Sequence, residues 1–312
     1  MFRIIFIGVV AAFFFSSTFV LNRAMSLEGG YWVWSASLRY FWMLVILGVW
    51  LLVTGKGRLG LGAVKLFFRH WVFWTLAGSV GFGVFYALIT FSSVFAPGWV
   101  VAATWQTTIL ATPLVLLAFG RRIPLKALAL TVIIFVGVVL VNLEQASATG
   151  WREMLLGALP VLVAAFAYPF GNQLVWEARR GEKSFVPSID HPAMDDPFCR
   201  VLLLTFGSLP LWVILIAVTM PPLPSTGQVT QTALVALCSG VIATSLFLYA
   251  RYHARNTAEL AAADCTQSME VVFSLAGEAL LLGHVVPGSL GWTGIALTML
   301  GLMLYVTVQS RQ

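Results

Sequence analysis

The sequence predicts an all-α polytopic membrane protein, with ten transmembrane helices arranged as two inverted five-helix repeats. Three observations predict this fold class: long apolar runs, basic residues gathered on one side of them, and an internal repeat. The chain is 60% hydrophobic and only 10% charged, whereas a soluble domain has about 25% charged residues. This composition excludes a soluble globular protein, so the lipid bilayer is the first partner that we expect.

The apolar runs are long enough to cross a membrane, because about 20 apolar residues span the hydrocarbon core of a bilayer. No convincing small-residue cleavage site follows the first run, so we expect it to be retained as a span. One connection is long, polar and rich in proline and charge, and it predicts a mobile loop at residues 177–197. The ten predicted spans are residues 4–22, 31–54, 72–92, 97–119, 125–143, 154–176, 198–218, 229–250, 257–283 and 289–308.

The basic residues predict how these spans are oriented. With the N-terminus in the cytoplasm, 15 of the 18 Lys and Arg residues fall on the inner side. Only Arg23 and Arg152 fall on the outer side, and Arg39 lies within a span. This positive-inside pattern predicts an inner (cytoplasmic) membrane protein with both termini and the 177–197 loop in the cytoplasm. Because the basic residues lie between apolar runs, we expect no nucleic-acid partner.

An internal repeat predicts a division into an N-terminal half, residues 1–150, and a C-terminal half, residues 151–312. Segment 97–108 aligns with segment 258–269 at an offset of 161 residues, which places Gln106 on Gln267. Each half holds five spans, an odd number, so the second half inserts upside down relative to the first. Inverted repeats are typical of secondary transporters, whose sites lie at the repeat interface near the membrane midplane.

The predicted span 257–283 gives the strongest functional signal, since it contains four of the chain's twelve carboxylates. At about 100° per residue, Asp264, Gln267, Glu270 and Glu278 fall within one arc of roughly 120°. A carboxylate at mid-bilayer costs about 2.5–3.5 kcal/mol, so it usually faces a cavity or a partner. We predict that Glu270 couples proton movement to transport; the alternative is a static ion pair or a hydrogen bond to a neighbouring helix. Asp264 is either a second position for the proton or a charge at the mouth of the cavity. No role is assigned to Glu278.

Other residues within the spans are predicted to line a substrate cavity. Arg39 lies about 12 Å into its span, at 1.5 Å per residue. Its buried charge needs a partner, and Glu270 is the one expected from its depth. Gln106 and Gln267 either line the cavity or form hydrogen bonds between helices. The predicted cavity residues are Arg39, Trp105, Gln106, Gln267, Tyr168 and Asn172.

Two long segments carry a resemblance to a known family. Residues 76–143 contain a glycine-rich span with Tyr86, a small-residue span closed by Thr112-Pro113, and a span that ends in GVVLVN. Residues 237–306 contain Glu270-Val271-Val272-Phe273, where the family often shows Glu-Pro-Val-Phe. In order, these features resemble the two repeats of the drug/metabolite transporter superfamily, in its ten-span EamA-like form. The chain looks most similar to the multidrug resistance efflux transporter branch, which implies an exporter.

The chain also departs from this family at three positions. Arg121 and His284 stand where the family often has an acidic residue, and Arg23 stands where it often has a lysine late in span one.

The sequence contains none of the motifs GxxxxGK[ST], HExxH or GxSxG. Its three cysteines, Cys199, Cys238 and Cys265, form no CxxC pair. We therefore expect a protein that is not an enzyme and has no catalytic residue, cofactor or metal site.

The predicted function is secondary active transport, as a proton-coupled exporter of small organic molecules, either drug-like cations or metabolites. The expected assembly is a monomer or a homodimer. One alternative is an amino-acid or metabolite carrier without proton coupling. Another is a membrane-embedded lipid flippase or enzyme, for which His191, Asp195 and Asp196 of the 177–197 loop are the available groups.

Overall fold

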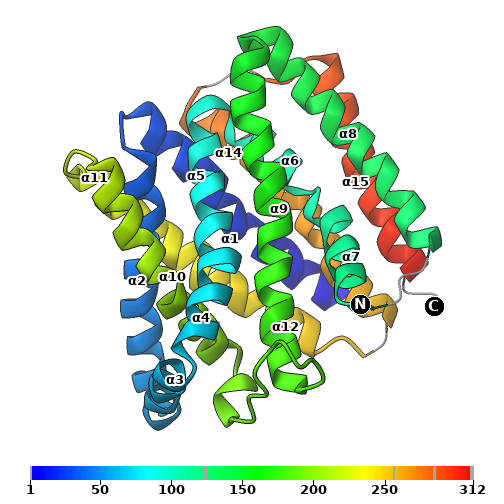
Figure 1. The fold of residues 1–312 in the computed structure, drawn as a ribbon. Coiled ribbons are helices and arrows are strands. Elements are labelled where there is room, and N and C mark those ends of the chain that lie inside the picture. Colours follow the sequence, from blue (N-terminus) through cyan, green and yellow to red (C-terminus); the bar gives the residue numbers. More distant parts are fainter. Residues whose placement is uncertain (1, 122–124, 256, 284–285, 310–312) are drawn as a thin grey trace.

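The chain folds as one bundle of helices (Figure 1). The computed structural model describes residues 2–121, 125–255, 257–283 and 286–309. Over this part of the chain the secondary structure is α-helical with short π and 3₁₀ segments and no strand, which confirms the all-α prediction.

Eight helical segments are long and apolar enough to cross a membrane, and each coincides with a predicted span. The other two predicted spans fall on a helix divided by a turn, and on a helix whose described apolar part is shorter than 18 residues. The eight segments are α1 (Phe2–Leu27), α2 (Trp32–Val53), Trp71–Phe95, Gly98–Ala118, the apolar part of α8 (Leu125–Thr149), α9 (Trp151–Arg180), α10 (Pro197–Thr219) and Thr226–Arg251. The remaining two are α13–α14 (Thr257–Cys265 and Met269–Leu281) and α15 (Ser289–Gln309).

Two of the spanning segments pass through a π-helical turn. In the first, α4 (Trp71–Gly78) and α5 (Phe85–Phe95) flank η1 (Ser79–Val84). In the second, α11 (Thr226–Val235) and α12 (Thr244–Tyr252) flank η3 (Ala236–Ala243). Such turns are frequent at functional sites.

Glycine allows η1 to approach α9 closely. A Cβ atom built on Gly171 would lie 2.3 Å from the Cα atom of Gly81, so the two backbones meet where neither residue has a side chain.

Two further helices are interrupted at the glutamines that the repeat aligns. Helix α6 (Gly98–Trp105) ends just before Gln106, and α7 (Thr108–Ala118) begins two residues later. The corresponding interruption is η4 (Thr266–Ser268), a 3₁₀ turn that contains Gln267. In both places a threonine hydroxyl donates to a carbonyl three residues earlier, at 2.7 Å for Thr107 and 2.6 Å for Thr266. Such side-chain bonds compete with the regular helical pattern.

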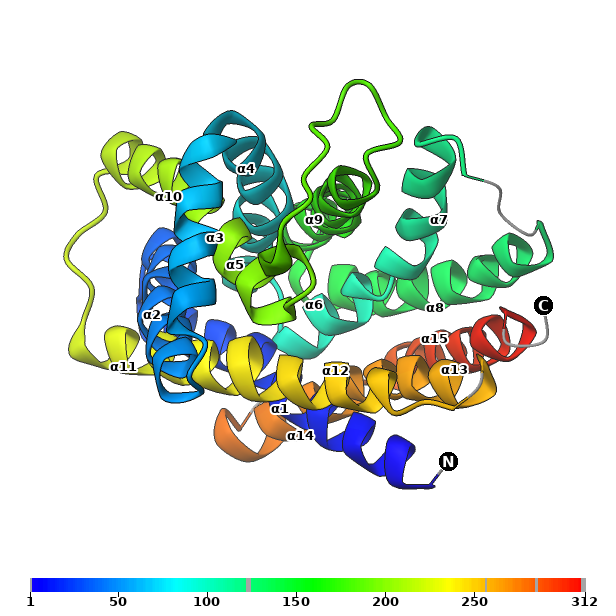
Figure 2. The ribbon, with the colours of Figure 1, turned by 90° about the horizontal axis from the view of Figure 1, so that it is seen from below.

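Helices α8 and α15 lie side by side in both views (Figures 1 and 2). Small residues let them approach, since a Cβ atom on Gly294 would lie 2.6 Å from the carbonyl oxygen of Gly137. The carboxylate of Glu144, on α8, accepts hydrogen bonds from the backbone N–H groups of Gly288 at 2.7 Å and Gly291 at 2.5 Å. Glu144 therefore caps the N-terminus of α15.

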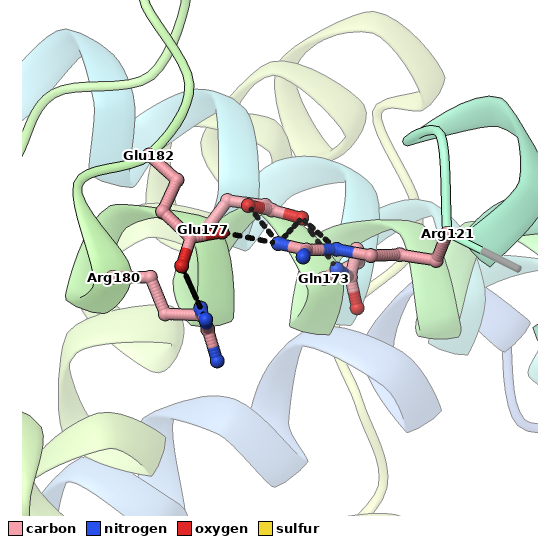
Figure 3. A network of polar contacts seen from close by, with 5 residues as sticks. All are labelled: Arg121, Gln173, Glu177, Arg180 and Glu182. Atoms are coloured by element: carbon pink, nitrogen blue, oxygen red, sulfur yellow. Dashed lines mark hydrogen bonds and ion pairs between the residues drawn. The ribbon is translucent and has the colours of Figure 1, made fainter.

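Ion pairs hold several side chains of the 177–197 segment, the predicted loop. The carboxylate of Glu177 is fully buried, and it accepts hydrogen bonds from Arg121 at 2.9 and 3.0 Å and from Gln173 at 2.8 Å (Figure 3). Arg121 also pairs with Glu182 at 3.0 Å, and Arg180 pairs with the same carboxylate. These contacts fix the turn after α7 to the end of α9.

Further along the segment, Asp196 caps α10. Its Oδ1 atom accepts from the backbone N–H groups of Phe198 and Cys199 at 2.9 and 3.1 Å. Its Oδ2 atom pairs with Lys56 Nζ at 2.6 Å. The short helix η2 (Pro192–Met194) packs against α3 (Gly57–Arg69) just before this cap.

Candidate functional site

A cavity of about 200 Å³ lies inside the bundle. Residues from before and after position 150 line it, and all four helix interruptions reach it: Phe82 from η1, Ser239 from η3, and Gln106 and Gln267 from the two breaks. Broken helices in membrane proteins occur where the chain lines a cavity, because unpaired backbone groups are costly against lipid. The interruptions are therefore features of the cavity wall.

The structure brings six of the eight predicted site residues to this cavity. The six are Arg39, Trp105, Gln106, Tyr168, Gln267 and Glu270. Asp264 and Asn172 lie outside the lining. The carboxylate of Asp264 pairs with Arg251, and the Asn172 amide donates to the carbonyl of Tyr168 in its own helix at 2.9 Å.

Glu270 lies in the first turn of α14, directly after η4. Its side chain is only 6% exposed. In the part of the chain that the structure describes, the carboxylate has neither an ion pair nor a hydrogen bond, so the static-pair alternative has no partner there. A buried carboxylate without a partner is costly in its ionised form, so a proton or a cationic ligand stabilises it.

The expected ion pair between Arg39 and Glu270 is wrong. The Arg39 guanidinium instead donates to Ser239 Oγ at 3.1 Å, and its Cζ atom lies 4.1 Å from the centre of the Tyr86 ring. Its Nε atom is buried and has no hydrogen-bond partner among the described residues. Among the described residues, the cavity therefore holds a cation and a carboxylate that each lack an ion-pair partner. Similar depth in two spans does not determine which way each side chain points around its helix.

Three aromatic rings form one wall of the cavity. Phe85, Trp105 and Tyr168 come from three different helices, and their ring centres are 4.9 to 5.7 Å apart. Packed rings of this kind give a rigid apolar surface, and their faces attract cations.

The sequence reasoning missed Phe82, Phe85 and Ser239. Phe82 and Ser239 lie in π turns, which have no pattern of their own in the sequence.

Gln106 uses its side-chain amide within its own helix, donating to the carbonyl of Ala102 at 3.3 Å. It nevertheless lines the cavity, as Gln267 does. In the described structure Gln106 therefore makes a hydrogen bond within its helix and not the predicted one between helices.

Glu278, which had no predicted role, is a structural carboxylate. It is 1% exposed and accepts hydrogen bonds from the backbone N–H groups of Gly98 at 2.7 Å and Trp99 at 3.0 Å. These are free donors at the N-terminus of α6, where a negative charge is stabilising. Glu278 therefore caps a helix that precedes it by 180 residues.

The polar side chains named for the enzyme alternative take part in local structure. His191 Nδ1 accepts from the backbone N–H of Ala193 at 3.1 Å, and Asp195 pairs with Arg179 at 2.9 Å. Asp196 caps α10, as described above. Among the residues that the structure describes, no group of three or more His, Cys, Asp or Glu side chains is placed to hold a metal ion.

The chain matches a protein-family model, two proteins of known sequence and a solved structure. The EmrE family model, described as "Putative multidrug resistance efflux transporter", matches residues 2–311. The "Uncharacterized protein YjlA" of Bacillus subtilis is 39% identical over 97% of this chain and 94% of that protein. An "Uncharacterized 42.1 kDa protein in intracellular alkaline protease 3'region" of Shouchella clausii is 42% identical over 80% of this chain and 65% of that protein. A solved crystal structure with 15% identity has the same fold, with a TM-score of 0.62 over 99% of this chain and 97% of that chain.

Proposed function

Because the chain belongs to the EmrE family, described as "Putative multidrug resistance efflux transporter", we propose that it is a proton-coupled exporter of small organic molecules. This multi-pass membrane protein would act in the cytoplasmic (inner) membrane, with both termini on the cytoplasmic side. The observation that carries the proposal is Glu270, a buried carboxylate without a partner in the described structure, which lines a cavity between the two halves of the chain.

The proposed architecture is ten spans in two inverted repeats, residues 1–150 and 151–312. The paired interruptions support it: each half has one π turn and one break, and the breaks hold Gln106 and Gln267 at the repeat offset. Inverted repeats with discontinuous helices at the central site are typical of secondary transporters, in which one repeat rocks against the other.

In the proposed cycle, Glu270 holds either a proton or the substrate. A proton taken up on one side neutralises the carboxylate, and its release on the other side leaves the carboxylate free to bind a cationic group. Each proton that moves inward releases about 2.3 kcal/mol per 100 mV of membrane potential. A monovalent cation that moves outward in exchange uses the same amount, so the pH difference drives this one-for-one exchange. Asp264 lies six residues away, about 9 Å along the helix axis at 1.5 Å per residue. We assign it the second position on the proton path, reached when its pair with Arg251 opens.

The cavity favours a compact substrate. Its volume of about 200 Å³ is below the roughly 300–1,000 Å³ of sites for drug-sized ligands. The aromatic wall of Phe85, Trp105 and Tyr168 and the Glu270 carboxylate together suit a small organic cation with an apolar body.

Arg39 favours a second candidate, a carrier of carboxylate-bearing metabolites without proton coupling. Its guanidinium lines the same cavity and keeps a buried Nε–H without an acceptor in the described structure. A substrate carboxylate would satisfy this donor through a charge-assisted hydrogen bond.

Proton release from purified protein tests the proposal. Small organic cations and carboxylates are added to the detergent-solubilised protein, and the pH of a weakly buffered solution is followed. Wild type should release protons on binding a cation, whereas Glu270→Gln should release none and should bind the cation more weakly. The matched control is Glu28→Gln, which changes an exposed carboxylate just after α1 and should release protons as wild type does.

Two outcomes count against proton coupling through Glu270. Undiminished release from Glu270→Gln would assign the proton to another group. Binding of a carboxylate without any release from wild type would favour the uncoupled carrier.

A further inference from the structure

Helix α3 lies across one end of the bundle, between two spanning segments. It has 13 residues, GRLGLGAVKLFFR, and links α2 to α4. Figure 1 shows α2 along its length with α3 seen nearly end-on, whereas Figure 2 shows α3 along its length. A helix in this position is parallel to the membrane surface when the spans cross the membrane.

The two sides of α3 differ in character. Its buried residues are Gly60, Ala63 and Leu66, which face the bundle. At about 100° per residue, the exposed residues fall within one arc of about 100° on the other side. Leu61 and Phe68, which are 66% and 68% exposed, form the apolar edge of this arc. Its basic edge consists of Arg58, Lys65 and Arg69.

The three basic residues of this arc form no ion pair in the part of the chain that the structure describes. The acids of the neighbouring 177–197 segment are paired with other bases. These acids are Glu177, Glu182, Asp190, Asp195 and Asp196, and their partners are Arg121, Arg179, Arg180 and Lys56.

A crevice of about 380 Å³ opens where α3 meets α4. Arg69 and His70 lie on one side of it, and Trp71, Phe73 and Phe185 give it apolar walls. Burial and then the neighbouring Arg69 charge lower the pKa of His70, so Arg69 is the cation of the crevice at neutral pH. A single cation beside apolar walls matches a molecule with an anionic head and a hydrocarbon tail.

We propose that α3 and this crevice form a binding site for an anionic phospholipid. The lipid phosphate contacts Arg69, with Lys65 one helical turn away, and the acyl region covers Phe68 and Trp71. Basic amphipathic helices bind the membrane interface in this manner, with apolar residues at the acyl boundary and cations at anionic headgroups. The site joins α2 and α4–η1, which both line the central cavity through Arg39 and Phe82.

The test is competition between two lipids with the same chains. Purified protein is incubated with equal amounts of dioleoyl phosphatidylglycerol and dioleoyl phosphatidylcholine, and the lipids that remain bound are counted by native mass spectrometry. Wild type should retain phosphatidylglycerol in preference to phosphatidylcholine. Each basic residue near such a headgroup contributes roughly fivefold, so Lys65→Gln/Arg69→Gln should lower that preference roughly 25-fold. The control Arg152→Gln, on an exposed residue at the start of α9, should leave it unchanged.

Three results would overturn the proposal: equal retention of the two lipids by wild type, an unchanged preference in the double variant, or displacement of the lipid by an equal concentration of glycerol 1-phosphate. The last result would identify a site for a free phosphate. If the double variant melts below wild type, Lys65→Arg/Arg69→Lys decides the question. This variant keeps both charges and should keep the lipid preference.

Discussion

Glu270 and Glu278 lie eight residues apart on α14, and the same substitution should affect them in opposite ways. Glu278→Gln replaces one acceptor oxygen with an N–H₂ group that faces the backbone N–H of Gly98 or Trp99. A buried donor left without an acceptor costs about 1–3 kcal/mol, so this variant should be destabilised by that amount. Glu278→Ala leaves both donors without an acceptor and should cost about twice as much.

Glu270→Gln should not destabilise the protein. Its carboxylate has no partner to lose in the described structure, and a neutral amide removes the cost of a buried charge. Thermal unfolding in detergent, followed by tryptophan fluorescence, measures both variants. The midpoint should fall for Glu278→Gln and should stay level or rise for Glu270→Gln.

Ligand-induced proton release gives the opposite pattern. Glu278→Gln, assayed below its midpoint, should still release protons, whereas Glu270→Gln should not. Loss of stability in Glu270→Gln together with a normal midpoint in Glu278→Gln would refute the assignment of one carboxylate to transport and the other to capping.

Two further predictions concern stability. A Cβ atom on Gly207 would lie 1.9 Å from the carbonyl oxygen of Trp74. Gly207→Ala should therefore force α4 and α10 apart and lower the free energy of unfolding by about 1–3 kcal/mol or more. The control Gly48→Ala places nothing within 4 Å of the new atom and should have the same melting temperature as wild type. Burial raises the pKa of Asp196, whereas hydrogen bonds from Lys56 and two backbone N–H groups lower it. The lowering is the larger effect, so the pKa lies below its ordinary value. The stability that ionised Asp196 adds to the fold is therefore present at neutral pH and is lost as the pH falls through the lowered pKa. Asp196→Ala should be less stable than wild type at about pH 7, by about 1 kcal/mol for the lost cap. The difference should narrow as the pH falls below the ordinary aspartate pKa of 3.8; a difference independent of pH would contradict this reading.

Hydrophobic runs predicted most of the fold, because the length of an apolar run directly limits what can cross a bilayer. Eight of the predicted spans are helices of the required length and composition. The alignment paired Gln106 with Gln267, and both lie at helix interruptions that the sequence did not predict. The π turns η1 and η3 were not predicted, since nothing in their sequences distinguishes them from ordinary helix.

Contacts between side chains of distant segments were the hardest to predict. The depth of Arg39 and Glu270 in their spans suggested a pair, but depth gives no direction around the helix axis. Ser239 is the observed acceptor for Arg39. The role of Glu278 depended on the start of α6 lying beside it, and helix periodicity within α14 contains no information about that neighbour.

The two capping carboxylates make the halves of the chain depend on each other. Glu278, from the second half, supplies the acceptor for the start of α6, and Glu144, from the first half, does the same for α15. Each half therefore caps the N-terminus of one helix in the other half, and one of its own helices depends on the other half for its cap. If the chain were cut within residues 177–197, each fragment would have an incomplete helix until it met the other. Co-expressed fragments should then accumulate only as a pair, as expected if the two halves fold as one unit.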